Sequence, residues 1–315
     1  MTPHGDRGEV VNTSGCEPDI RGFDSLRSPH LIAIPFIYSF SNKWFFYFKK
    51  YKEIFKFLLN YKVEVAKMRN NGKNYEEMIV NKLNNKKISE LSEFWRKIIK
   101  EMFDVADDNE IVSARVIGKS CKTDIEIYCM DKKINISVKT GDHNSFHQEN
   151  IFQLLDFLHK SGVSQRTLNI IKFYHFGDGT IDGTGSKRMD AAEIKLKYAK
   201  LIREANEEIN KREIIENVFE RFVTKGVKES YQKIDYVYYG DTEFGYLVTP
   251  DELLQYALRH RCMFLSGLHF GPLNYQPYKR LLNSQKGYDK DRYLVQIKWI
   301  GLLSDIQKIK LQYSY

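Results

Sequence analysis

Three short segments in the middle of the chain alternate apolar with polar residues, and this pattern constrains the fold more than any other feature. The segments are 111–117, 123–128 and 133–139, with Asp131 and Lys132 forming a turn between the last two. Alternation with a period of two is typical of strands that bury one face. Because the connections are short, we expect a meander of antiparallel strands.

Helical periodicity surrounds this meander. The sequence predicts helices over 75–83, 89–102, 146–160 and most of 190–225, and further strands over 168–173, 234–239, 244–248 and 293–299. Helices placed before and after antiparallel strands predict an α/β protein, in which helices flank one mixed sheet.

Composition excludes several classes of protein. The chain has 315 residues, of which 42% are hydrophobic and 29% charged, so it is not disordered as a whole. Its longest apolar run, 31–40, contains a proline and is shorter than the roughly 20 residues that span a bilayer, and no secretory signal is evident. Four cysteines without a CxxC pair argue against a zinc ribbon or a disulfide framework. We therefore expect a cytoplasmic protein that does not bind membranes.

The net charge of +8 favours a polyanionic partner. Four regions are expected. A loosely ordered tail covers 1–30, an aromatic and basic helical region covers 31–70, a central core covers 71–190, and a helical and β-rich region covers 191–315.

Acidic and basic residues coincide on two neighbouring strands of the predicted meander. The period of two places Asp124 and Glu126 on one face of their strand, and Ser137 and Lys139 on one face of the next. If the strands pair, Lys139 approaches Asp124 at the edge of the sheet. A carboxylate, a second oxygen acceptor and a lysine can together hold Mg²⁺ and orient a water molecule.

The run KTDIEIY…INISVKTG resembles the PD-(D/E)XK nuclease superfamily, which is typical of restriction endonucleases, over roughly residues 71–175. Asp124 matches the first acid of the pattern and Lys139 matches the lysine. Ser137 stands where the second acid is expected, as in a variant that moves the missing carboxylate onto the following helix. The resemblance then implies Glu149 as the second metal ligand, with Glu126 as the alternative.

Further residues around this pattern are candidates for accessory roles. An earlier helix could add Glu76 or Glu77 to the metal site. His143 and His147 could act as general acids, DNA contacts or, at their spacing of four, metal ligands, and Gln148 could orient Glu149 or cap the helix.

Basic, amide and hydroxyl side chains in the central core and in the C-terminal region are candidates for DNA contacts. The alternative for each of them is an ordinary solvated surface residue. The candidates are Asn144, Ser145, Lys187, Arg188, Arg259, Arg261, Lys279 and Arg280.

The resemblance implies a restriction-endonuclease-like core and a Mg²⁺-dependent endonuclease that cuts double-stranded DNA, as a type II restriction enzyme does. Two cuts in a palindrome would favour a homodimer by symmetry. Two alternatives stay open: an inactive nuclease-fold protein for DNA binding or phage defence, and a nuclease that acts on RNA or on nucleic-acid ends.

Overall fold

The structure is a computed structural model that describes residues 72–117, 121–141, 143–185, 188–228, 232–261, 265–278 and 289–312. The predicted tail at 1–30 and the predicted helical region at 31–70 lie outside the described residues.

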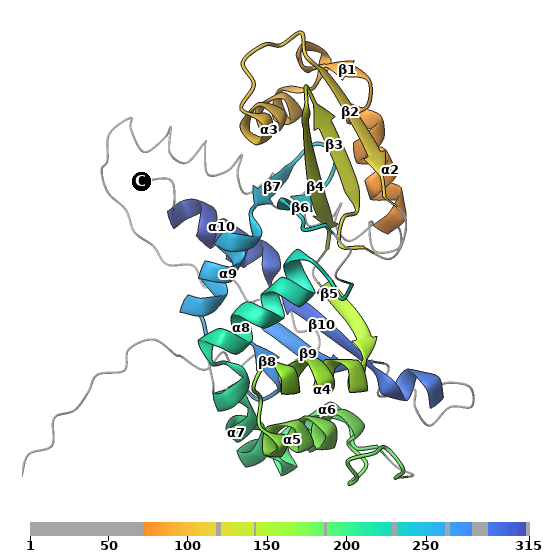
Figure 1. The fold of residues 1–315 in the computed structure, drawn as a ribbon, viewed down its shortest axis with the longest axis vertical. Coiled ribbons are helices and arrows are strands. Elements are labelled where there is room, and N and C mark those ends of the chain that lie inside the picture. Colours follow the sequence, from red (N-terminus) through yellow and green to blue (C-terminus); the bar gives the residue numbers. More distant parts are fainter. Residues whose placement is uncertain are drawn as a thin grey trace, which may run out of the picture. The chain divides into compact units, whose positions relative to one another are not determined.

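The predicted meander belongs to a six-stranded sheet (Figure 1). In spatial order its strands are β1 (Lys86–Lys87), β2 (Ile111–Val116), β3 (Ile125–Cys129), β4 (Lys132–Lys139), β6 (Tyr236–Gly240) and β7 (Gly245–Val248). Only the pairing of β4 with β6 is parallel. The sheet is therefore mixed, as predicted.

Two helices and a 3-10 turn complete one core against this sheet. They are α2 (Gly72–Leu83), η1 (Ile88–Glu90) and α3 (Glu93–Phe103). Apolar residues of both helices pack against alternate residues of β2, β3 and β4, such as Val112, Ile127 and Ile136. Residues of the opposite parity, which include Glu126 and Ser137, point away from this core.

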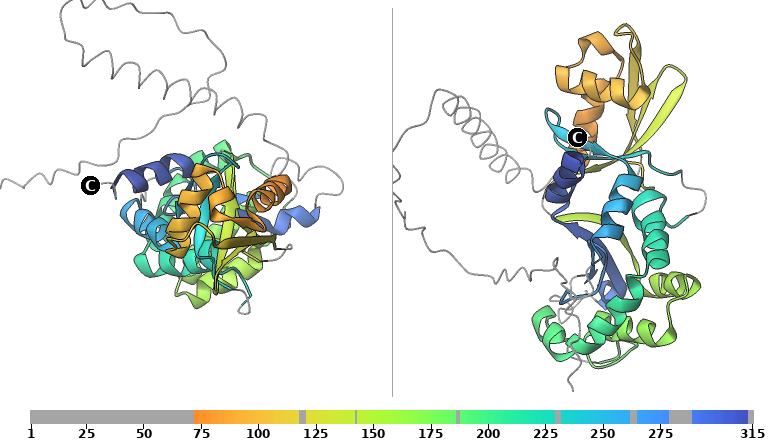
Figure 2. Two further views of the ribbon diagram at one scale, coloured as in Figure 1. Left: turned by 90° about the horizontal axis from the view of Figure 1, so that it is seen from above. Right: turned by 90° about the vertical axis from the view of Figure 1, so that its left-hand side faces the viewer.

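A second, four-stranded antiparallel sheet has the order β5 (His143–Asn150), β10 (Leu294–Ile300), β9 (Leu273–Pro277) and β8 (His269–Phe270). Helices pack around it (Figure 2). They are α4 (Ile151–Lys160), α5 (Gln165–Phe176), α6 (Ala191–Lys197), α7 (Ala199–Ile209), α8 (Arg212–Phe219), α9 (Pro250–Arg259) and α10 (Leu302–Gln312), with the π-helical turn η2 (Glu220–Thr224) after α8 and the 3-10 turn η4 (Asp289–Tyr293) before β10. No helix in the described ranges is both long and apolar enough to cross a bilayer.

Two predicted elements are wrong. The segment predicted as the start of a helix at 146 is strand β5, and the helix α4 begins only after Asn150, whose side chain accepts a hydrogen bond from the Phe152 N–H. The partner of β5 lies far along the chain, in β10, so local periodicity could not indicate it. The segment 168–173, predicted as a strand, lies inside α5, which is capped by Ser164 and Gly177.

Both sheets take strands from each side of the predicted boundary at residue 190. Strands β6 and β7 complete the sheet that carries β3 and β4, while β5 pairs with β10. The end of β4 and the start of β5 are close along the chain, and the candidate site lies where they meet.

Candidate functional site

The hairpin of β3 and β4 brings Asp124 beside Ser137 and Lys139. The Asp124 N–H donates to the Ile136 carbonyl at 2.9 Å, which extends the strand pairing by one residue. The Asp124 carboxylate accepts through Oδ2 from the Ser137 hydroxyl at 2.9 Å and from the Val138 N–H at 2.6 Å. The ammonium of Lys139 lies 3.6 Å from the same oxygen. The expected proximity of the acid and the amine is confirmed.

Short contacts fix the Lys139 ammonium. Its Nζ donates to the Ser137 hydroxyl at 2.7 Å and to the Val138 carbonyl at 3.1 Å. It also lies 5.5 Å from the centre of the Phe146 ring, within the range of a cation–π interaction. The buried Ser137 hydroxyl therefore links the amine to the carboxylate, where the superfamily pattern has a second acid.

The oxygen atoms at this edge fit Mg²⁺. The contacts that the Asp124 carboxylate makes with described residues fall on Oδ2, and the Ser137 hydroxyl and the Val138 carbonyl add neutral oxygens. Mg²⁺ commonly takes one or two protein carboxylates and completes its shell with phosphate oxygens and water. Within the described ranges, no cluster of three or more His, Cys, Asp or Glu side chains could hold a metal ion. The arrangement suits a metal that is bound together with a phosphate.

A second cluster contains Glu149, on β5 rather than on a helix. Its buried carboxylate accepts two hydrogen bonds from Arg221, at 2.6 Å to Oε2 and 3.3 Å to Oε1, and the His147 Nε2 lies 3.3 Å from Oε1. Burial opposes ionisation, but hydrogen bonds from His147 and Arg221 outweigh it and lower the pKa of Glu149. Glu149 is thus an ionised partner of the partly buried Arg221 guanidinium.

Lys122 connects the two clusters. Its ammonium donates to the Phe146 carbonyl and lies 3.4 Å from the His147 Nδ1. Burial, together with the positive charge of Lys139, lowers the pKa of Lys122 to about 7. Burial likewise lowers the pKa of His147, whose ring stacks on Phe222 with 4.7 Å between centroids.

Lys122 and Arg221 are two residues of this region that were not predicted from the sequence. Lys122 shares the alternation that was used for Asp124, since it stands two residues earlier, so that signal was present. Arg221 lies in the π-helical turn η2, 72 residues from its partner Glu149, and no local pattern marks it.

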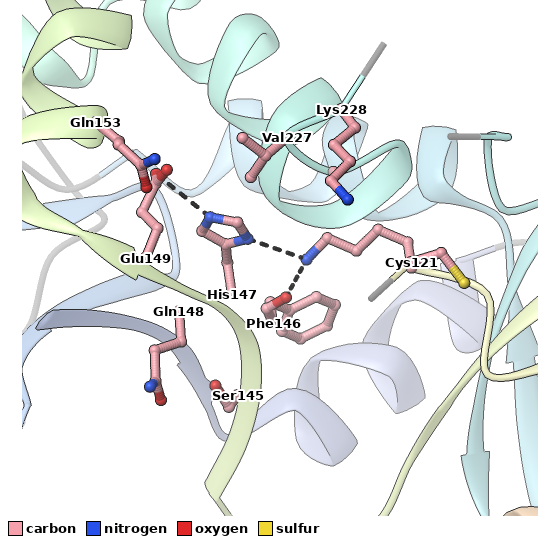
Figure 3. Close-up of a pocket in the computed structure, with 11 residues that line it drawn as sticks. Cys121, Ser145, Phe146, His147, Gln148, Glu149, Gln153, Val227 and Lys228 are labelled. Atoms are coloured by element: carbon pink, nitrogen blue, oxygen red, sulfur yellow. Dashed lines mark hydrogen bonds and ion pairs between the residues drawn. The ribbon is translucent and has the colours of Figure 1, made fainter. Parts of the chain in front are cut away.

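A cavity of about 460 Å³ opens beside Lys122. Figure 3 shows His147 and Glu149 pointing to one side of β5, and Ser145 and Gln148 to the other. Because Gln148 and Glu149 diverge, Gln148 does not orient Glu149. The cavity is lined by Cys121, Lys122, Ser145, Phe146, His147, Gln148, Glu149, Gln153, Gly226, Val227 and Lys228.

Glu126, the alternative second ligand, is also bound to cations. Its buried carboxylate accepts from Arg115 Nε at 2.7 Å and from the Tyr128 hydroxyl at 2.6 Å, and Lys133 Nζ lies at 3.4 Å. Burial opposes ionisation, yet hydrogen bonds from Tyr128 and Arg115 lower its pKa. Both candidate second acids are therefore buried and bound by basic side chains, whereas Asp124, which pairs with Lys139, is partly exposed.

The remaining acidic and polar candidates take several places in the fold. Glu76 is half-buried and Glu77 is exposed, both on α2, which packs against β2. Asn144 is buried and donates to the Gly141 carbonyl at 2.9 Å, which favours a role in the turn before β5. Ser145 is exposed on β5.

Among the basic candidates, Arg188 donates to the carbonyls of His175 and Phe176 at the C-terminus of α5, each at 2.6 Å. Arg259 ends α9 and is exposed, and Arg261 is exposed while donating to the Leu258 carbonyl at 2.9 Å. Lys187, Lys279, Arg280 and the side chain of His143 lie outside the described residues.

The comparisons with known proteins find a similar solved structure but no match at the level of sequence. No family model and no curated protein match the chain. Among solved structures, the chain is similar to the restriction endonuclease MspI, determined in complex with its cognate DNA. The two share 16% identity with a TM-score of 0.47, and the match covers 72% of this chain and 88% of the other. This similarity is too low to decide fold or function.

Proposed function

We propose that the chain is a Mg²⁺-dependent endonuclease that hydrolyses phosphodiester bonds in double-stranded DNA, as a type II site-specific restriction enzyme does. One observation carries the proposal: Asp124, Ser137 and Lys139 meet at one sheet edge within hydrogen-bonding or ion-pairing distance. These residues match the first acid and the lysine of the PD-(D/E)XK pattern, with a serine at the position of the second acid.

Asp124 would hold the metal, and the Ser137 hydroxyl and the Val138 carbonyl are the nearest other oxygens. Bound Mg²⁺ would act as a Lewis acid that stabilises the negative charge developing on the scissile phosphate. Lys139, held by Ser137, would position the attacking water and add fixed positive charge beside the phosphate. Glu149 and Glu126 remain the candidates for a second acid, although each would have to give up a basic partner.

Cleavage of unmethylated plasmid and phage DNA tests this proposal. We expect discrete bands with Mg²⁺, none with EDTA, and none with Asp124→Ala or Lys139→Ala. The matched controls are Asp131→Ala and Lys132→Ala, which change an acid and a lysine at the other end of the same hairpin. Undiminished cutting by both Asp124→Ala and Lys139→Ala would refute the assignment. Light scattering with and without a cleaved palindrome would test the expected homodimer.

A second candidate function is DNA binding without cleavage, for example in phage defence. The observation that favours it is the hydroxyl of Ser137 at the position of the second acid, with both substitute carboxylates already paired to cations. Binding of duplex DNA without any Mg²⁺-dependent cutting would support this candidate over the first.

A further inference from the structure

One face of the four-stranded sheet carries a continuous set of polar side chains. The pairing of β5 with β10 places Ser145 opposite Lys298 and Gln148 opposite Gln296. The pairing of β10 with β9 continues these rows to Asn274 and Gln276. We call these six residues the amide face: Ser145, Gln148, Asn274, Gln276, Gln296 and Lys298.

Alternation separates the amide face from the core. The residues between them, such as Tyr275, Val295 and Ile297, are buried against the helices. Ser145 and Gln148 are exposed, and the four residues on β9 and β10 are half-buried, as expected for side chains on the central strands of an open face.

The chemistry of this face suits the edges of bases. Four of the six side chains are amides, one is a hydroxyl and one is an ammonium, so hydrogen-bond donors and acceptors are dense while acidic groups are absent from the six. The Gln296 amide donates to Gln148 at 2.9 Å, which would hold two of the amides in register. Amides pair with adenine, lysine with guanine and hydroxyls with several bases. The positive charge of the Lys298 ammonium also complements a polyanion.

The amide face borders the cavity beside Lys122, and Phe146 of the same strand lies 5.5 Å from the Lys139 ammonium. The register of β5 against β10 shifts between Ile297 and Lys298, so that both Phe146 and His147 are buried in a bulge. Lys122 donates to the Phe146 carbonyl in this bulge, and Ser145 and Gln148, which flank it, line the cavity beside Lys122. A duplex with its backbone at Lys139 could therefore present its bases to the neighbouring sheet.

We propose that the amide face contacts base edges in a groove of duplex DNA and sets the sequence preference of the protein. The inference rests on the proposed function, because it takes the DNA to be the same molecule that is cut. The residues assigned here to base recognition are therefore not the basic residues of the C-terminal region, which the sequence favoured for this role.

Selection from a duplex library tests the proposal. The full chain is incubated with DNA carrying a randomised segment, with Ca²⁺ in place of Mg²⁺ so that binding is read without cleavage. We expect the wild type to enrich a defined sequence. Gln276→Ala and Asn274→Ala should each lower the preference at one or two positions, by about 5- to 150-fold. Gln276→Glu, which keeps the shape of the side chain but removes its donor, should change the preferred base at the same position. Gln255→Ala, on the exposed surface of α9, is the matched control and should keep the motif.

The possible outcomes separate this proposal from the proposed function. If the amide-face variants enrich the wild-type motif unchanged, the face does not read bases, whatever the cleavage assay shows. A wild-type chain that enriches no duplex motif, or that prefers single strands, also overturns the inference. If Asp124→Ala loses cutting but still enriches the wild-type DNA motif, the loss of cutting supports the catalytic site. The retained motif then supports recognition by a surface other than that site, as proposed for the amide face. Thermal unfolding of each variant confirms that a lost motif is not a lost fold.

Discussion

The hairpin edge at Asp124 and the cluster at Glu149 both join an acid to a basic side chain, but they are built differently. Asp124 meets Ser137 and Lys139 within one hairpin, at a separation of 13 residues from Ser137. Glu149 meets Arg221 across 72 residues and between a strand and a π-helical turn. The side chain of Asp124 is 25% exposed and that of Glu149 is 3% exposed.

This difference indicates different roles. Asp124 is accessible, and its contacts with described residues use one carboxylate oxygen, so the other can take a new ligand. Both oxygens of the buried Glu149 carboxylate are bound to Arg221, and releasing them would leave the partly buried guanidinium without its acid. Removing one partner of a buried pair is costly because the other charge stays uncompensated. We infer that the first cluster serves chemistry and the second serves architecture.

The largest expected effect separates the two acids by activity. Asp124→Asn should reduce DNA cleavage by about 10³-fold or more, because it removes the charge of the carboxylate that is proposed to hold the metal at the hairpin edge. Glu149→Gln should retain cleavage within about 10-fold and lose stability instead. Initial rates on plasmid DNA and urea unfolding of the same preparations measure both quantities.

A loss of cleavage without a loss of stability in Glu149→Gln would change the roles assigned to the two acids. If Glu149→Gln abolishes cleavage while its unfolding midpoint stays at the wild-type value, Glu149 belongs to the metal site, as the resemblance to the nuclease superfamily implies. Arg221 would then be a partner that yields to the metal.

The second prediction concerns stability. Arg221→Met should lower the free energy of unfolding by about 3–5 kcal/mol, because the buried Glu149 carboxylate would lose both of its hydrogen bonds from the guanidinium. Adding Glu149→Gln to Arg221→Met should recover much of this loss. Arg212→Met, which removes an exposed pair with Glu216, is the control and should cost about 0–1 kcal/mol. Equal losses of stability in Arg221→Met and Arg212→Met would show that the pair of Glu149 and Arg221 stabilises the fold no more than an exposed pair does.

The hairpin edge could be predicted from the sequence because its information is local. Alternation fixed the faces of β3 and β4, and the short turn fixed their pairing, so Asp124, Ser137 and Lys139 had to meet. The expected mixed sheet with flanking helices is confirmed for the same reason.

The surroundings of β5 could not be predicted in this way. The sequence of β5 has no clear period of two, and a bulge at Phe146 and His147 breaks its alternation. Its partner β10 lies nearly 150 residues away, and the residue that neutralises Glu149 lies in a helical region. Conversely, the apolar run 168–173 fits a strand or a buried helix equally, and only the caps at Ser164 and Gly177 decide for α5.

The third prediction uses Lys122, whose pKa of about 7 in the folded chain lies well below its ordinary value of 10.5. Between these two values the unfolded chain binds more protons than the folded one, so stability should rise with pH. The slope is about 1.4 kcal/mol per pH unit while the difference is one proton. Lys122→Met should lack this rise and be more stable than wild type near pH 9. Lys132→Met, an exposed lysine, serves as the control. Parallel stability curves for wild type and Lys122→Met would show that Lys122 stays charged.

The smallest expected effect concerns the hydroxyl that ties the hairpin edge together. Ser137→Ala removes the bond to Asp124 and the bond from Lys139, but the Val138 N–H still holds the carboxylate and the Val138 carbonyl still holds the ammonium. A hydrogen bond to a charged group contributes about 1.5–3 kcal/mol, so cleavage should fall about 12- to 150-fold. Initial rates at saturating Mg²⁺, with Ser145→Ala as the control for an exposed serine on β5, measure this. A loss of cleavage as large as that of Asp124→Asn would instead indicate that the Ser137 oxygen binds the metal directly. The serine would then replace the second acid as a ligand, and the site would not have lost a ligand.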